Sequence, residues 1–273
     1  MNKINVNGII MRICCNKYKE LRKQFKLKEK NILGWEIIDV YGDINLNQEY
    51  TFKNNNLILK CEDTYLHLSE KILLALKKLR EIYDINEGIV KCDDDLIINK
   101  NELIKFLEMK NKEDYIGKNF KKKDIINPIS YINFNKVIHN DFLINYYNKH
   151  KSDKIYIESL LEKFDKKLKN INCFPGINNI VALGHIYYLS NKSIDIVVDN
   201  FIKKNDFTFF SIIFEDNKYY PYVYEDVGIG YILFKNNINF KNNSEMWYNP
   251  HYQELDKTPP LNYIGFHTNE GNI

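Results

Sequence analysis

Three consecutive carboxylates are the feature of this sequence with the clearest chemical potential. Asp93, Asp94 and Asp95 lie between two apolar runs, in the segment KCDDDLIIN of residues 91–99. Adjacent carboxylates repel one another, so a folded protein holds them together with a compensating cation. Hard oxygen ligands suit Mg²⁺ or Mn²⁺, which in turn bind phosphate oxygens. The segment therefore predicts a cation site at the end of a strand, and the alternative is a solvated acidic turn.

Common calcium- and phosphate-binding motifs do not account for this segment. Aligned as an EF-hand loop that starts at Asp93, it has Ile98 where the loop needs Gly and Ile104 where it needs Glu. The sequence also contains neither a Walker phosphate loop nor a GxGxxG fingerprint. The sequence therefore lacks the motifs that usually indicate ATP or NAD binding.

The composition is that of a folded protein rather than a disordered or strongly basic one. The 273 residues are 44% hydrophobic and 27% charged, with a formal net charge of +3. This balance is too even to indicate nucleic acid as the main partner. No run approaches the roughly 18 apolar residues of a membrane span, and no signal peptide is recognisable. Five cysteines without a CxxC pair indicate reduced, buried thiols, so we expect a soluble cytoplasmic protein.

Alternating strand and helix patterns must position the acidic segment. Strands are expected at residues 8–15, 35–41, 57–60 and 89–90, and a strand follows a loop within 178–189. Helices are expected at residues 18–27, 63–83, 102–109 (capped by Asn101), 158–168, 192–204 and 227–234. This order predicts an α/β fold with a mostly parallel central sheet and helices on both faces. Ligands of such sheets bind beyond the carboxyl ends of the strands, where the acidic segment falls.

Several motifs together resemble glycosyltransferase family 31, the β-1,3-galactosyltransferase and fringe group. Residues 91–99 are similar to its DxD signature, and residues 61–79 (CEDTYLHLSEKILLALKKL) to the helix that precedes it. The triplet at 41–43 (YGD) and residues 20–25 (ELRKQF) resemble earlier motifs of the family. Downstream, residues 184–190 (GHIYYLS) and 224–233 (YEDVGIGYIL) resemble its acceptor-side and glutamate-aspartate-valine blocks. The resemblance covers roughly residues 18–109 and 178–240, whereas residues 110–177 match no motif.

This resemblance implies a single GT-A-like domain over residues 1–273. Residues 1–109 would form the nucleotide-sugar-binding half and residues 110–273 the acceptor-binding half. The implied reaction is the metal-dependent, inverting transfer of a hexose or N-acetylhexosamine from a UDP-sugar to a glycan or other hydroxyl acceptor, in β-1,3 linkage. Mn²⁺, or Mg²⁺, would neutralise the leaving diphosphate.

The resemblance also implies roles for individual residues. The metal would be held by Asp95, Asp93 and the late histidine His267, with His251 as the alternative histidine. The UDP-sugar would be contacted by Arg22, Asp63, Lys71, Asp93 and Asp94. The acceptor side would include Gly184, His185, Tyr187 and Glu225.

Asp226 is the predicted catalytic base. It follows four tyrosines between residues 219 and 224, and burial among aromatic rings raises the pKa of a carboxylate and its strength as a base. The resemblance implies that it removes the proton from the acceptor hydroxyl. Alternatively, Glu225 and Asp226 are the acidic first turn of a helix, and both interpretations can hold together.

Two other functions remain open from the sequence. The first is a non-catalytic carbohydrate- or nucleotide-binding module with the same fold, which the presence of both Asp95 and Asp226 disfavours. The second is nucleic-acid binding through the 20 tyrosines and a lysine-rich surface. The only basic triplet is at residues 121–123, and a solvated loop explains it adequately. We therefore expect neither nucleic acid nor a membrane span among the partners.

Overall fold

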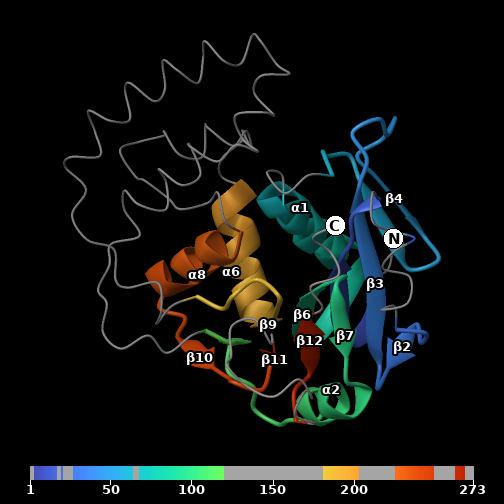
Figure 1. The fold of residues 1–273 in the computed structure, drawn as a ribbon. Coiled ribbons are helices and arrows are strands. Elements are labelled where there is room, and N and C mark those ends of the chain that lie inside the picture. The colour runs from blue at the N-terminus through green and yellow to red at the C-terminus, as the bar shows by residue number, and fades with distance from the viewer. Residues whose placement is uncertain are drawn as a thin grey trace, which may run out of the picture. The chain divides into compact units, whose positions relative to one another are not determined.

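The computed structural model describes residues 3–16, 20, 27–63, 68–119, 181–202, 225–248 and 262–267 (Figure 1). The chain divides into two compact units, residues 1–119 with 181–273, and residues 120–180. All described residues belong to the first unit. The helix expected at 158–168 lies outside the described residues, and so does nearly all of the one expected at 18–27. The prediction of one domain over residues 1–273 stays a prediction.

A large mixed sheet organises the described part of the chain. Its strands are β1 (Ile4–Ile13), β2 (Asn31–Ile32), β3 (Trp35–Gly42), β4 (Tyr50–Lys53), β5 (Asn56–Leu59), β6 (Tyr83–Asp93), β8 (Tyr115–Gly117), β9 (Ile186–Ser190) and β10 (Phe240–Asn242). Their order is β10-β8-β9-β6-β1-β3-β5-β4, with β2 paired to β3. The strands expected at 8–15, 35–41, 57–60 and within 178–189 are confirmed to within a few residues. The one expected at 89–90 is the end of a much longer strand, β6.

The sheet is mixed rather than mostly parallel, which corrects the prediction. Strands β6, β1, β3 and β5 pair in parallel, as do β10 and β8. Antiparallel pairing joins β9 to both β6 and β8, β4 to β5, and β2 to β3. The last two pairs follow from their connections, because Leu33–Gly34 and Asn54–Asn55 are two-residue turns with positive φ angles. Such tight turns allow only antiparallel neighbours.

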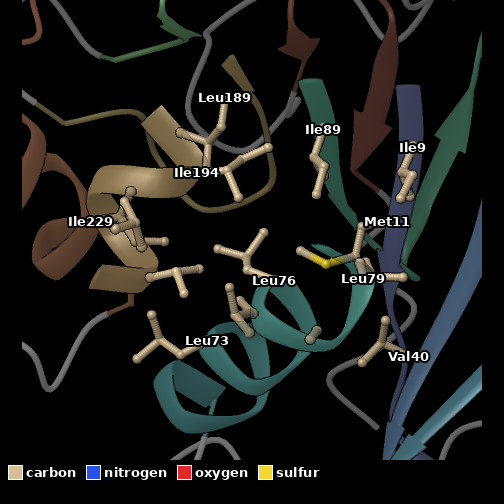
Figure 2. Close-up of a cluster of buried hydrophobic side chains, with 14 of the residues drawn as sticks. Ile9, Met11, Val40, Leu73, Leu76, Leu79, Ile89, Leu189, Ile194 and Ile229 are labelled. Carbon is tan, nitrogen blue, oxygen red and sulfur yellow. The ribbon is translucent and has the colours of Figure 1, made fainter. Parts of the chain in front are cut away.

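Three helices pack together on the core of this sheet: α1 (Leu68–Ile82), α6 (Asn191–Ile202) and α8 (Glu225–Lys235) (Figure 1). Figure 2 shows Leu73, Leu76 and Leu79 of α1 pointing toward side chains of the strands and of the other two helices. These leucines are buried because apolar residues recur every three or four positions along α1, which gives the helix one apolar face. The predicted helix at 63–83 is confirmed over α1. Asp63 lies before the helix, residues 64–67 lie outside the described residues, and Tyr83 already begins β6.

The helix after the acidic segment is α2 (Lys100–Leu107), two residues earlier than predicted. Its N-cap is Asn99 rather than Asn101. The Asn99 side chain accepts hydrogen bonds from the backbone N–H groups of Asn101 and Glu102, at 3.2 and 3.5 Å. The extended backbone of Asn99 allows this geometry, whereas Asn101 is already helical. Phe106 of α2 packs edge-on against Tyr188 of β9.

A second, three-stranded sheet follows the acidic segment directly. Strand β7 (Leu96–Ile98) pairs antiparallel with β12 (Gly265–His267), which pairs parallel with β11 (Trp247–Tyr248). This sheet joins the segment after the acidic residues to the C-terminal part of the chain.

Two further expectations concern membranes and thiols. No helix in the described part of the chain has the length and apolarity needed to cross a membrane. The cysteines that the structure describes are free thiols: Cys14, Cys61 and Cys92 are buried, and Cys15 is partly exposed.

Candidate functional site

The acidic residues form the turn between β6 and β7. Asp93 ends β6 and pairs in register with Ile13, the last residue of β1. Because β6 and β1 run in parallel, the turn lies beyond the carboxyl ends of two neighbouring strands. The sequence prediction of an acidic cluster at such an edge is confirmed.

The small sheet brings His267 to this turn. Antiparallel pairing places His267 opposite Leu96, the residue that follows Asp95. The Nε2 atom of His267 lies 3.3 Å from Oδ2 of Asp95. The chain therefore brings together two predicted metal ligands that are far apart in sequence. The alternative ligand, His251, lies outside the described residues.

His185 lies next to this pair and is uncharged near neutral pH. Its ring centroid is 4.6 Å from that of His267 and 4.5 Å from that of Trp247. Burial lowers the pKa of His185 to about 4, and its electrostatic interactions with His267 and Lys91 act in the same direction. His185 also holds the acidic turn through its backbone, because its carbonyl oxygen accepts a 3.0 Å hydrogen bond from the Asp93 N–H.

Asp94 is turned toward the protein interior. Its Oδ2 accepts a hydrogen bond of 3.2 Å from the backbone N–H of Cys15, and its own N–H donates to the Ile13 carbonyl at 3.2 Å. The side chain therefore fixes the backbone that follows β1. The predicted contact of Asp94 with the UDP-sugar stays a prediction.

Asp63 and Lys71 support the same stretch of backbone after β1. The Lys71 ammonium donates to Oδ1 of Asp63 at 2.7 Å and to the Cys14 carbonyl at 2.9 Å. The other Asp63 oxygen accepts from the Asn16 N–H at 2.7 Å. Lys71 is buried, so this ion pair stabilises the loop after β1 from the protein interior. Arg22, the remaining predicted nucleotide contact on this side, lies outside the described residues.

The second acidic pair begins helix α8, which starts two residues before the predicted helix at 227–234 and agrees with the alternative interpretation of Glu225 and Asp226 as a helix start. Asp226 Oδ2 accepts a hydrogen bond of 3.1 Å from the backbone N–H of Gly184, and Glu225 Oε2 accepts one of 3.0 Å from the Tyr187 hydroxyl. A Cβ atom at Gly184 would lie 3.0 Å from Glu225 Oε1, so the close approach favours glycine. Burial raises the pKa of Glu225 to about 7, against the lowering effect of Lys91.

Lys91 connects the two acidic groups, and the sequence analysis missed it. Its ammonium lies 2.6 Å from Asp93 Oδ1 and 3.1 Å from Glu225 Oε1, and it also donates to the Gly184 carbonyl. Burial lowers the pKa of Lys91, but the two carboxylates outweigh it and keep the side chain charged. A signal was present, because residues two apart on a strand share a face, and Lys91 is two residues before Asp93.

The structure therefore joins most of the predicted site residues in one set of contacts. These are Asp93, Asp95, Gly184, His185, Tyr187, Glu225, Asp226 and His267, with Lys91 added. They come from β6, the β6–β7 turn, β9 and its preceding loop, α8 and β12. Among the described residues, no three His, Cys, Asp or Glu side chains are close enough to hold a metal by themselves.

The Asp95–His267 pair nevertheless fits a cation that takes its other ligands from elsewhere. Adjacent ligands of an octahedral Mg²⁺ or Mn²⁺ lie about 3.0 Å apart, because each is roughly 2.1 Å from the ion. The 3.3 Å between the Asp95 and His267 atoms is close to this spacing. An imidazole ligand is less usual for Mg²⁺, so the donor set favours Mn²⁺.

The described residues thus form a mixed α/β fold with acidic side chains beyond the ends of two parallel strands. Residues 20–174, more than half of the chain, match the family model described as galactosyltransferase. The chain belongs to the galactosyltransferase family, which confirms the resemblance seen in the motifs. This membership supports glycosyltransferase activity and implies a sugar donor and an acceptor. No curated protein matches the chain.

Proposed function

We propose that this protein is a GT-A-like, metal-dependent glycosyltransferase that uses a UDP-sugar. It transfers a hexose or N-acetylhexosamine to a hydroxyl group of a glycan acceptor, with inversion at the anomeric carbon and in β-1,3 linkage. One observation carries the proposal. The acidic turn, His267 and the Glu225–Asp226 pair meet beyond the end of β6, although the last two lie more than 100 residues after the acidic turn in the sequence.

Asp95 and His267 would hold the cation, Mn²⁺ by preference over Mg²⁺. When bound, the cation supplies positive charge that stabilises the leaving diphosphate. Asp93 stands beside this pair and is itself held by Lys91, so its contribution is to the charge and shape of the donor pocket. The donor's phosphate oxygens and water would supply the other ligands of the cation.

Asp226 would act as the general base. The Gly184 N–H fixes one carboxylate oxygen, and its place in the first turn of α8 fixes the backbone. In this position the carboxylate takes the proton of the acceptor hydroxyl while the acceptor oxygen attacks the anomeric carbon directly. A single displacement of this kind inverts the configuration at that carbon. The proton ends on Asp226, and the bond that breaks is the one between the sugar and the diphosphate.

On the acceptor side, His185 is the group best placed to contact the substrate directly. It is neutral, partly exposed and next to His267, so one ring nitrogen can accept a hydrogen bond from a sugar hydroxyl. Tyr187 and Glu225 are buried and bind each other, so their effect on the acceptor would pass through the position of Asp226.

The test is UDP release from UDP-galactose by the purified protein, measured with Mn²⁺ and with EDTA. We expect turnover that needs Mn²⁺ and is lost in Asp95→Ala. Asp84→Ala is the matched control, since Asp84 is an exposed aspartate on the same strand at the other end of β6. Binding of UDP and Mn²⁺ by calorimetry without any release of UDP would instead identify a non-catalytic nucleotide-binding module. Turnover that is equal in Mn²⁺ and EDTA would refute the metal assignment.

A further inference from the structure

We infer that Lys91 is a positioning residue that holds the proposed catalytic base, Asp226, in place relative to the donor site. This inference rests on the proposed function, because it concerns how Asp226 is placed relative to Asp93. Lys91 is the first residue of the DxD-like segment, and the sequence analysis gave it no role; its role follows from three contacts made by one buried ammonium group.

The three contacts reach three separate segments of the chain. The Lys91 ammonium bonds to Asp93 at the end of β6, to the Gly184 carbonyl before β9, and to Glu225 at the start of α8. An ammonium group has three N–H donors, so these three acceptors use all of them. The side chain is 1% exposed, which leaves little room for another arrangement. The ammonium therefore links the end of β6, which carries Asp93, to the start of α8, which carries Asp226.

The charges explain why a cation is needed at this point. Asp93 and Glu225 are carboxylates that both lie within hydrogen-bond distance of one nitrogen atom, and Asp226 follows Glu225 directly. Without the ammonium, like charges would face each other in a buried site, where their repulsion is poorly screened. The start of α8 and the end of β6 would then move apart. Lys91 thus allows two negatively charged elements to approach each other.

The position of Asp226 depends on the same contacts. Gly184 accepts from Lys91 through its carbonyl and donates to Asp226 Oδ2 through its N–H, so one residue links the lysine to the base. Glu225 is held on one oxygen by Lys91 and on the other by the Tyr187 hydroxyl. Loss of the ammonium releases both supports of the segment that carries Asp226. A displacement of about 1 Å at a reacting group can lower a rate by about 100-fold.

The experiment compares Lys91→Met with wild type in UDP release from UDP-galactose and in calorimetry with UDP and MnCl₂. Methionine has a similar length and no charge, so it can fill the buried space. We expect kcat to fall at least about 100-fold, with KM and UDP affinity within about fivefold of wild type, because Asp95 and His267 form a separate contact. A variant that merely unfolded in part would lose binding and turnover together.

A second substitution tests whether the effect passes through Glu225. Glu225→Gln removes the negative charge that Lys91 neutralises, so Lys91→Met combined with Glu225→Gln should recover kcat at least about tenfold over Lys91→Met alone. The matched control is Lys78→Met. Lys78 is also buried and bonds to two carboxylates, Glu49 and Glu81, but it lies on α1 away from the site. It should lower thermal stability and leave kcat unchanged.

The outcomes separate this inference from the proposed function. A wild-type protein that neither binds UDP with Mn²⁺ nor releases it refutes the proposed function. An active wild type with a fully active Lys91→Met variant refutes only the role of Lys91, as does a double variant without recovery. If Lys91→Met does not fold, Tyr187→Phe supplies the test, because it releases the other Glu225 oxygen without burying a charge. An unchanged kcat in that variant overturns the inference.

Discussion

Asp226→Asn is the substitution that separates catalysis from binding most cleanly. Asparagine has the shape of aspartate, and its carbonyl oxygen can accept the hydrogen bond that the Gly184 N–H donates to Asp226 at 3.1 Å. The neighbouring Glu225 keeps its contacts with Lys91 and Tyr187. The geometry of the site should therefore survive, and only the ability to take up a proton is lost.

The expected magnitudes follow from this geometry. Loss of a positioned general base lowers turnover by roughly 10²–10⁴, which corresponds to about 3–5 kcal/mol in the activation free energy. The free energy of unfolding should change far less. Asp226 lies in the first turn of α8, and a negative charge there contributes about 0.3–1 kcal/mol through the helix dipole. Binding of UDP should remain close to wild type, because the proposed cation ligands are Asp95 and His267.

The assay is a paired measurement on one variant, with UDP release from UDP-galactose for turnover and calorimetry with UDP and Mn²⁺ for binding. Asp195→Asn is the matched control. Asp195 lies in α6 and pairs with Arg80 at the surface, so its loss should cost little stability and no activity. Near-normal turnover by Asp226→Asn would remove Asp226 from the mechanism and leave it as a helix-start residue. Loss of UDP binding in step with turnover would also refute the reasoning, since it would place Asp226 on the donor.

The remaining predictions concern metal binding, pH and the core. His267→Ala should weaken Mn²⁺ affinity, measured by titration calorimetry, while circular dichroism stays unchanged; an effect confined to His251→Ala would show that the wrong histidine was chosen. Burial, together with the charge of Glu62, raises the pKa of Glu70 to about 7 in the folded protein, so stability should fall as pH rises from about 4.5 to 7. In Glu70→Gln, the free energy of unfolding measured with urea should lose that part of its pH dependence. The same pH dependence in the wild type and the variant would contradict this prediction. Leu76→Ala, at a fully buried position in the core, should lower the free energy of unfolding by about 2–5 kcal/mol, and a loss below about 1 kcal/mol would mean that the site collapses around the cavity.

Local patterns determined much of what could be predicted. The apolar period of residues 72–79 predicted α1, and the alternation and turn residues around β3 and β5 predicted those strands, because such patterns act within one element. The acidic turn was also predicted from its neighbours alone, since three carboxylates followed an apolar strand. Motif order was enough to indicate the galactosyltransferase family, which the family match confirmed.

Boundaries between elements were harder to predict from the sequence. Helix α1 runs directly into β6 at Tyr83, and the cap of α2 is Asn99 rather than Asn101. In both cases residues within two positions of each other satisfy the same local preference. The choice between them depends on strand pairing, here of β6 with β1 and of β7 with β12. The direction of β9 between β6 and β8 depends in the same way on contacts between distant segments.

The composition of the candidate site was decided by the tertiary structure. The sequence supplied the Asp93–Asp95 turn, the Glu225–Asp226 pair and a late histidine as separate features, and the pairing of β7 with β12 selects His267 among the described residues. Lys91 has no unusual sequence context beyond its place two residues before Asp93. Its proposed role depends on Asp93 of the same strand and on two acceptors from distant segments, Gly184 and Glu225, which meet it only when β6, β9 and α8 pack together. A buried charge is stabilised by its partners, and partners brought by long-range packing are not encoded in any local pattern.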